Sequence, residues 1–441
     1  MSRALTAGML LVLAAGGPGA HASQALEAAV KNDYEQHLGP LFEHFHANPE
    51  LSFMEFETAA RMADEFRELG FTVHEEIGVT GIVALLENGP GPTVMMRADM
   101  DGLPVKEMVS LPYRSKVEKE NSEGQVFPVM HACGHDVHIT SLIGTARQMV
   151  ANRDQWSGTL MLLGQPAEEW KDSGAKAMKE DGIWDKVAPP DYALAFHVSS
   201  EFEAGKIHVD NAAAYSGVDS VDIIVPGVGT HGARPHKGKD PVVIGSQIVL
   251  ALQTLVAREL SPREPGVVTV GVFRAGNKRN VISEQARLEV TVRSDSLETR
   301  AKLLGGIKRI AENVGRAAGL PEGNLPRVEL MGTLPVTVND GELASRLRGA
   351  WGRELGETIF ADYQRDGMGG EDFPYLTNDP YIPSVYFKVG GTLAEDFARE
   401  AAGETSVAAH HSPWFKIAPE PAVRTGVVAT VTALLELMPV E

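Results

Sequence analysis

The sequence predicts an α/β protein, in which a layered α/β domain carries an inserted ferredoxin-like domain. Four runs are apolar at nearly every position, as strands covered on both faces are: residues 81–86, 93–97, 159–163 and 192–196. A helical pattern over residues 136–150 separates two of these runs, and alternating strands and helices are typical of a layered α/β domain. The order of the expected elements changes near Asn211, which indicates the inserted domain.

The first long element is a helix expected over residues 51–70. Apolar side chains share one face of this helix: Ala59, Met62, Ala63, Phe66 and Leu69. Gly70 suits its C-terminal end because glycine adopts the left-handed conformation that ends many helices.

The inserted domain is expected to follow the ferredoxin-like order of strand, helix, two strands, helix and strand. The expected elements are a strand at 221–225, a helix at 241–260, strands at 267–274 and 286–293, a helix at 297–318 and a strand at 327–331. Residues 337–340 would form the return hinge. The predicted organisation is therefore an N-terminal signal (1–22), the first part of the larger domain (23–211), the inserted domain (212–335) and the second part of the larger domain (336–441).

Length and charge restrict the class of protein. A chain of 441 residues is too long for one core and suits two or three domains. The 43% hydrophobic and 22% charged fractions are ordinary for a globular protein. Because the net charge is −19, we do not expect a nucleic-acid partner, which requires a basic face.

The N-terminus resembles a secretory signal. Arg3 supplies a positive start, residues 5–15 are mostly apolar, and Ala20-His21-Ala22 offers a small-x-small cleavage site. We expect cleavage after Ala22 and a periplasmic or secreted location. No later segment is predicted to cross a membrane, so no membrane association is expected after cleavage.

The run from Met130 to His138 contains the chain's one cysteine, Cys133, and His135 two positions later. A thiolate and an imidazole at this spacing can converge on one metal ion. The alternative is a buried inert thiol and a packed histidine, which is the usual explanation for a lone cysteine. In an exported protein, metal ligation would also shield the thiol from oxidation.

Other possible metal ligands follow the predicted strands. Asp99 and Asp101 follow the strand at 93–97, Glu168 and Glu169 follow that at 159–163, and His197 follows that at 192–196. Sites in open α/β sheets form at the carboxyl ends of strands, so we expect these side chains to share one edge.

Each of these residues also has a structural explanation. The two glutamates can be a solvated pair, the two aspartates a turn pair, and His197 a satisfied core histidine. Near the C-terminus, His410 and His411 are adjacent, and their spacing cannot choose between them. In the inserted domain, Arg293 could grip a carboxylate and His231 could stabilise an oxyanion, or both could be solvated.

The motifs of the chain together resemble those of the M20 metallopeptidases, in particular the amidohydrolase branch with hippurate hydrolases and auxin-conjugate hydrolases. The matching motifs are HANPELSFMEFETA, RADMDGLPV, MHACGHDVH, GQPAEE, GTHGARPHKGKDP, NVIS and HHSPWF. They occur in the family's order over nearly the whole mature chain.

The resemblance implies two divalent metals about 3.5–4 Å apart, with Zn²⁺, Mn²⁺ or Co²⁺ as the candidates. The implied ligands are Cys133, His135, Glu169, His197 and His411. Glu168 would be the general base and later the acid, and Asp101 would orient groups of the site. Asn280 and Arg293 would hold the substrate's α-carboxylate, and the inserted domain would be both a lid and a homodimer interface. His231 would then reach the neighbouring subunit's site.

The resemblance implies hydrolysis of the amide bond of small N-acyl amino acids. One alternative is a dipeptidase or carboxypeptidase with the same fold. An alternative of another class is a secreted metal-binding protein without turnover.

Overall fold

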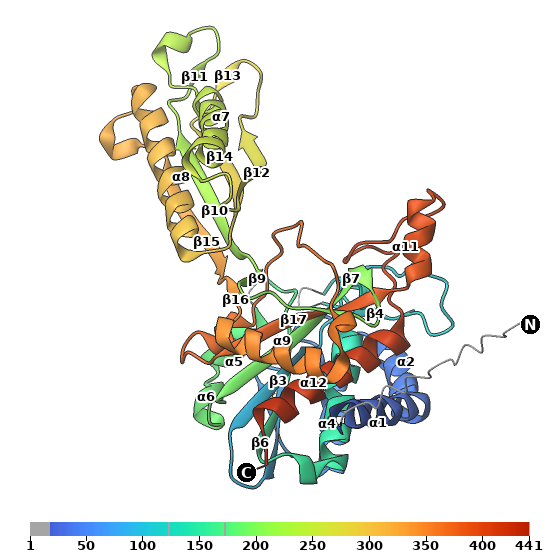
Figure 1. Ribbon diagram of the computed structural model, residues 1–441. Coiled ribbons are helices and arrows are strands. Elements are labelled where there is room, and N and C mark those ends of the chain that lie inside the picture. Colours follow the sequence, from blue (N-terminus) through green and yellow to red (C-terminus); the bar gives the residue numbers. More distant parts are fainter. Residues whose placement is uncertain (1–17, 122–123, 172, 441) are drawn as a thin grey trace, which may run out of the picture.

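The computed structural model describes residues 18–121, 124–171 and 173–440, which form a large lobe and a smaller lobe that projects from it (Figure 1). The large lobe is built on a seven-stranded sheet. Its strands, in spatial order, are β1 (Thr72–Ile77), β2 (Gly81–Asn88), β6 (Gly158–Gln165), β3 (Thr93–Asp99), β7 (Tyr192–Glu203), β17 (Ser384–Thr392) and β8 (Ile207–His208).

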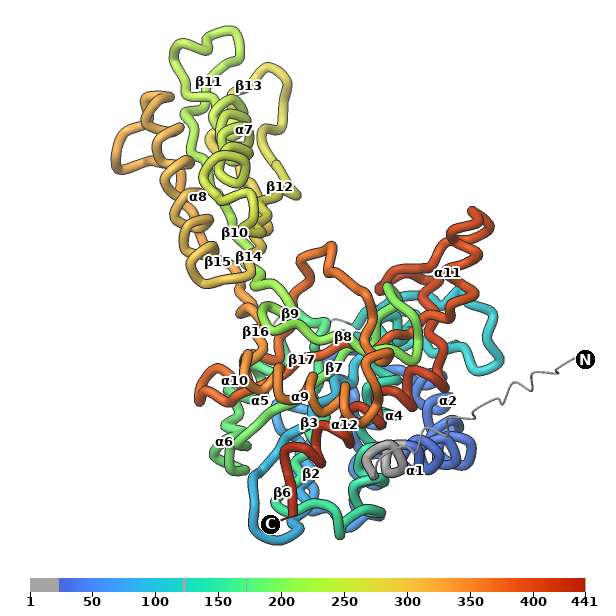
Figure 2. The backbone as a smooth tube through the Cα atoms, in the orientation of Figure 1, coloured from blue at the N-terminus to red at the C-terminus, as the bar shows by residue number. Residues whose placement is uncertain are grey.

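The centre of this sheet is parallel: β3 pairs in parallel with β6 and β7, and β7 with β17. Figure 2 shows that β17 comes from the C-terminal third of the chain, so the two sequence segments on either side of the small lobe complete one sheet. The central strands are apolar at nearly every position because both faces of this sheet are covered by other parts of the chain.

Helices cover the two faces of the sheet. One face packs on α1 (Pro18–Asp33), α2 (Gly39–Ala47), α3 (Phe56–Glu68), α4 (His135–Ala151), α9 (Gly341–Leu355) and α12 (Pro419–Leu437). The other face packs on α5 (Gly174–Glu180), α6 (Ile183–Lys186) and α10 (Pro374–Thr377). In β3, Val94 and Met96 point to the first core and Met95 to the second, which is the alternation of a doubly covered strand. A further helix, α11 (Ala394–Ala401), stands at the periphery (Figure 1).

The small lobe has a four-stranded antiparallel sheet in the order β12-β14-β10-β15. Its elements are β10 (Gly217–Pro226), α7 (Pro241–Glu259), β12 (Gly266–Ala275), β14 (Gln285–Ser294), α8 (Leu297–Ala317) and β15 (Arg327–Leu334). This is the ferredoxin-like βαββαβ order, and it confirms the predicted fold class. The short strands β11 (Thr230–His231) and β13 (Val281–Ile282) pair at the far tip of the lobe (Figure 1).

Two short strands connect the lobes: β9 (Ala213–Tyr215) pairs with β16 (Thr337–Val338). Both chain crossings therefore lie side by side at one narrow junction (Figure 1). The expected return hinge at 337–340 overlaps β16.

One helix of the described residues, α7, is long and apolar enough to cross a membrane by length and composition alone. In the fold, 33% of its apolar stretch is buried. Its buried side chains, which include Ile244, Ile248 and Leu252, belong to the core of the small lobe.

The helix expected over residues 51–70 is shorter in the structure. It begins at Phe56, because the preceding segment forms a loop in which Leu51 bridges Gly102. This loop brings Ser52 and Glu55 to the predicted functional edge, where they contact the loops after β3 and β6.

The N-terminal signal lies mostly outside the described residues. The structure describes the backbone from Pro18, where α1 begins, so the predicted cleavage point after Ala22 falls near the start of this helix.

Candidate metal centre

A cavity of about 410 Å³ lies at the functional edge of the large sheet. Side chains from both sequence segments of the large lobe line it, together with Arg293 of the small lobe. Six of the lining residues were predicted to belong to the site: Cys133, Glu168, Glu169, His197, His411 and Arg293. Residues far apart in the sequence therefore meet around one concavity.

Cys133 is placed by a tight turn that ends where α4 begins. Gly134 has a φ of 86°, and a Cβ atom there would lie 2.4 Å from Cγ1 of Val198. Only glycine fits this position, because a side chain would be strained and would also clash with β7. The turn sets Cys133 above the sheet and starts α4 at His135.

His197 approaches the thiol from the middle of β7, not from beyond the strand as predicted. β7 continues to Glu203 because β17 pairs with it up to that residue. The last residue of β7 that pairs with β3 is Ala195. His197 therefore lies just beyond the end of this pairing, although β7 itself continues.

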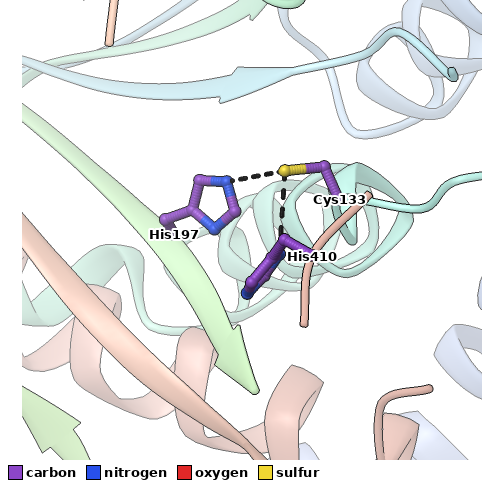
Figure 3. Close-up of side chains that lie close together, drawn as sticks. All are labelled: Cys133, His197 and His410. Carbon is purple, nitrogen blue, oxygen red and sulfur yellow. Dashed lines mark hydrogen bonds between the residues drawn. The ribbon is translucent and has the colours of Figure 1, made fainter. Parts of the chain in front are cut away.

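Cys133 Sγ lies 3.3 Å from Nε2 of His197 and 3.7 Å from Nδ1 of His410 (Figure 3). Nδ1 of His197 lies 2.6 Å from the carbonyl oxygen of Val198 and must donate to it. The proton of neutral His197 is therefore on Nδ1, and Nε2 keeps a lone pair directed at the thiol. Burial, with His138 and His410 nearby, holds the pKa of His197 well below its usual value, so the ring is neutral.

His411 and Glu169 form a second group with Cys133, and potential ligand atoms of the three lie within 4.8 Å of one another. Nε2 of His411 is 2.9 Å from Oε1 of Glu169. The His411 backbone has a φ of 66° and donates its N–H to the carbonyl of Ala132. This conformation is unfavourable for a residue with a side chain, and it is held by a bond to the turn that carries Cys133.

His135, at the start of α4, belongs to a further group with Glu168 and Glu169, and potential ligand atoms of these three also lie within 4.8 Å of one another. Its Nδ1 lies 3.2 Å from Oδ1 of Asp101, and Nε2 has no hydrogen-bond partner within the described chain, although the side chain is fully buried. Burial alone would lower the pKa of His135, but Asp99 and Asp101 outweigh it and raise the pKa to about 10. The carboxylates of Asp99 and Asp101 therefore favour a positive charge at the His135 ring.

These observations fit a cation between the side chains. Buried polar atoms normally have hydrogen-bond partners, yet Nε2 of His135 has none among the described residues, and Oε1 of Glu169 has only the His411 ring as a close contact there. One sulfur, imidazole nitrogens and a carboxylate are a donor set suited to Zn²⁺ and its neighbours in the first transition row. Burial and the carboxylates of Glu169 and Glu168 raise the pKa of Cys133 well above its usual value, so a cation is needed to hold a thiolate there.

Asp101 holds the loop that carries the two glutamates. It accepts the backbone N–H groups of Glu168 at 3.2 Å and Glu169 at 3.1 Å, and the Ser52 hydroxyl at 2.6 Å. Burial opposes its ionisation, but contact with His135 and Ser52 outweighs burial and lowers its pKa. Asp101 thus joins the loops after β3 and β6, as expected of two neighbouring strand ends.

Asp99 accepts from two sides, since Nδ1 of His138 is 2.5 Å away and the Arg97 guanidinium is 2.7 Å away. Nε2 of His138 accepts the N–H of Val198, so neither ring nitrogen of His138 is free for a metal. His138 therefore links Asp99 to the backbone of β7 and is not available as a metal ligand.

Glu168 lies beside a buried ionic cluster that the sequence analysis missed. Arg97 donates to Glu371 at 2.9 Å and to Asp372 at 3.2 Å. Carboxylate oxygens of Glu168, Glu371 and Asp372 lie within 4.8 Å of one another. Burial and the charges of Glu371 and Glu169 raise the pKa of Glu168 well above its usual value, which suits a proton acceptor. The adjacent acids of GGEDFP were a possible signal, but they follow no strand.

The structure separates the predicted residues of the inserted domain. Arg293, on β14 near the junction, lines the metal cavity. His231 and Asn280 lie at the distal tip, where His231 lines a different cavity and the Gly232 N–H donates to the Asn280 carbonyl. Within one chain, therefore, only Arg293 reaches the centre.

The family model of peptidase family M20/M25/M40 matches residues 95–431. Hippurate hydrolase of Campylobacter jejuni is 37% identical over 332 residues, which are 75% of this chain and 82% of that protein. Thermostable carboxypeptidase 2 of Saccharolobus solfataricus is 34% identical over 348 residues, 78% of this chain and 83% of that protein. Among solved structures, the Bacillus subtilis YxeP protein, described as a dinuclear metal binding peptidase from the M20 family, is similar with a TM-score of 0.73 and 26% identity. The match covers 94% of this chain and 100% of YxeP.

Proposed function

The chain belongs to peptidase family M20/M25/M40, and we propose that this metal-dependent amidohydrolase cleaves small N-acyl amino acids into an amino acid and a carboxylic acid. The observation that carries the proposal is that potential ligand atoms of Cys133, Glu169 and His411 lie within 4.8 Å of one another, with Glu168 in the same cavity. The similarity to hippurate hydrolase supports this substrate class.

We assign Cys133, His135, Glu169, His197 and His411 as the residues that hold two divalent cations. When bound, such a pair polarises the amide carbonyl and makes a water molecule more acidic. Zn²⁺, Mn²⁺ and Co²⁺ all suit the mixed sulfur, nitrogen and oxygen donors.

Glu168 is the proposed general base. Its carboxylate takes a proton from the attacking water and then gives it to the amide nitrogen as the C–N bond breaks. The raised pKa of Glu168 suits both steps, because the protonated carboxyl must persist long enough to serve as the acid. Asp101 acts as a positioning residue, since it fixes the backbone on which Glu168 and Glu169 stand.

Arg293 is the proposed binding group for the substrate's α-carboxylate. It lines the cavity, and no carboxylate pairs with it among the described residues. A half-buried guanidinium without an anionic partner is well placed to bind a carboxylate through two hydrogen bonds.

The central test compares Glu168→Gln with the unmodified enzyme on benzoyl-glycine. We expect kcat to fall by about 10²–10⁴-fold, while elemental analysis still finds the same metal content. Near-normal turnover in Glu168→Gln would contradict the assigned role. Metal binding without hydrolysis of any acyl amino acid by the unmodified protein would instead favour a non-catalytic metal-binding protein.

A dipeptidase or carboxypeptidase activity is the second candidate, and the similarity to thermostable carboxypeptidase 2 favours it. The same metal centre and carboxylate grip would serve a peptide bond next to a free C-terminus. Comparison of kcat/KM on benzoyl-glycine with kcat/KM on simple dipeptides and on longer acyl peptides separates the two candidates.

We also propose that the small lobe forms a homodimer interface and that His231 and Asn280 reach the partner's centre. His231 would stabilise the oxyanion of the partner's substrate, and Asn280 would assist Arg293 in binding its carboxylate. Exposed apolar side chains on the lobe support an interface: Val242, Val243, Leu250, Phe273, Leu330 and Met331. Light scattering of the purified protein tests the oligomeric state.

Export to the periplasm or the exterior remains our proposal from the N-terminal sequence. N-terminal sequencing of the protein purified from its native source should find Ser23 as the first residue. Retention of residues 1–22 would refute it.

A further inference from the structure

The cavity has a second cationic position that the proposed mechanism does not use. Lys388 lines the cavity from β17, and its backbone is paired with that of His197 on β7. Its ammonium nitrogen lies 5.3 Å from the ring centre of Tyr215 and 4.9 Å from that of Tyr363. Tyr215 also packs near the His197 ring, at 6.3 Å between centroids, so Lys388 stands beside the metal centre.

The charge of Lys388 is not neutralised by a direct ion pair. Nζ donates to the Tyr363 hydroxyl at 3.0 Å, and this hydroxyl donates in turn to Glu201. In the part of the chain that the structure describes, no carboxylate is in salt-bridge contact with Nζ. An ammonium on a largely buried wall, with one hydroxyl as its polar partner, is costly unless a ligand supplies the missing acceptors.

The neighbouring charged groups differ from Lys388 in this respect. Arg365 lines the same wall but is paired with Asp295. Glu201 lines it too, but its Oε2 is capped by Tyr363. Lys388 is thus the cation on this wall that remains available to a ligand, and it is distinct from Arg293 on the lobe side of the cavity.

We propose that Lys388 is a specificity residue that binds a second carboxylate of the substrate, so the enzyme prefers dianionic N-acyl amino acids. This inference rests on the proposed function, in which Arg293 takes the α-carboxylate. The second carboxylate can belong to the side chain of the amino acid or to the far end of a dicarboxylic acyl group. Both would present the same anion to Lys388.

The test uses two pairs of substrates that differ in one charge at nearly equal size. N-acetyl-L-glutamate is compared with N-acetyl-L-glutamine, and N-succinyl-L-leucine with N-butanoyl-L-leucine. For the unmodified metal-loaded enzyme, we expect kcat/KM to be about tenfold or more higher for the dianion in one pair. The pair that shows the preference identifies which end of the substrate faces Lys388.

In Lys388→Met this preference should disappear, because kcat/KM falls for the dianion and stays within about threefold for the neutral substrate. Lys388→Arg keeps the charge and should retain most of the preference. Lys206→Met is the matched control. Lys206 directly precedes β8, the strand with which Lys388 pairs through His208, but its ammonium bonds the carbonyl of Thr358 and does not line the cavity. A competition measurement with glutarate against butyrate checks binding to each variant without turnover.

Hydrolysis of the neutral substrates without any preference for either dianion would overturn this inference and leave the proposed function standing. An equal loss for neutral and dianionic substrates in Lys388→Met would assign the lysine a purely structural role. Failure to hydrolyse all four substrates, and acyl amino acids in general, would overturn the proposed function itself.

Discussion

The backbone N–H of Ser200 donates to Nε2 of His410 at 3.2 Å, and this contact decides what His410 can do. With Nε2 occupied as an acceptor, the proton of neutral His410 is on Nδ1, which points to Cys133 Sγ at 3.7 Å. Burial, together with His411 and His138, lowers the pKa of His410 to about 3, so the ring is neutral. His410 is therefore a hydrogen-bond donor to the cysteine sulfur, which leaves ligation to His411.

This relationship predicts different outcomes for the two adjacent histidines. His411→Ala should lose metal from one position and most activity, since it removes a proposed ligand. His410→Ala should keep both metals at saturating concentration and lose about 10–100-fold in metal affinity or activity, as is typical for a group that supports a ligand. Elemental analysis after metal titration measures both. The opposite pattern, with metal lost only from His410→Ala, would exchange the two roles.

The proposed trans role of His231 can be tested by complementation. Glu168→Gln and His231→Ala should each be nearly inactive alone. If they are mixed under conditions that exchange subunits, one site of each mixed dimer contains an intact Glu168 and the partner's intact His231. Equal mixing should restore about a quarter of normal activity, because half the dimers are mixed and each has one complete site. Mixtures that stay inactive despite proven exchange would contradict a role in the partner's site.

His46 should make stability depend on pH. Burial by itself lowers its pKa, but contacts with Asp136 at 2.7 Å and Glu107 at 3.2 Å outweigh burial and raise the pKa to about 9. Because the folded protein binds this proton more tightly than the unfolded chain, proton binding stabilises the fold. The stabilisation is complete at pH values below 6.5, the pKa of an unfolded-chain histidine, and is lost as pH rises through about 9. The difference corresponds to a contribution on the order of 3 kcal/mol.

Urea unfolding of the unmodified protein and His46→Gln at several pH values measures this contribution. The free energy of unfolding should differ most below pH ~6.5 and converge toward pH ~9. His44→Gln on the same helix is the control, because burial lowers the pKa of His44 and no raised-pKa contribution is expected from it. A constant difference across this range would show that His46 does not bind its proton more tightly in the fold.

Arg97 should be essential for stability. It is fully buried and pairs with Asp99, Glu371 and Asp372, so its loss leaves buried carboxylates without their cation. Arg97→Met should cost about 3–5 kcal/mol in the free energy of unfolding. Arg67→Met removes an exposed arginine that pairs with Glu75, and should cost far less than Arg97→Met, because water screens an exposed ion pair. Similar losses in the two variants would contradict the importance of the buried cluster.

Much of the fold follows from local patterns in the sequence. The runs at 81–86, 93–97 and 159–163 appear as β2, β3 and β6, because strands buried on both faces are apolar at successive positions. The order of elements in the inserted domain was also readable, since each element has its own periodicity. The helix over 51–70 was predicted too long, because the bridge from Leu51 to Gly102 depends on a segment fifty residues away.

The sequence by itself determined the chemistry that is available: one thiol beside a histidine, an acidic pair, and the motifs that place the chain in its family. Tertiary structure decided which ring nitrogen of each histidine is free, where Arg97 is neutralised, and that Lys388 meets Tyr363 and Tyr215 on a wall of the same cavity. The physical reason is that proton positions, burial and pairing depend on neighbours in space. Those neighbours come from strands and loops that are distant in the sequence and join only when the sheet forms.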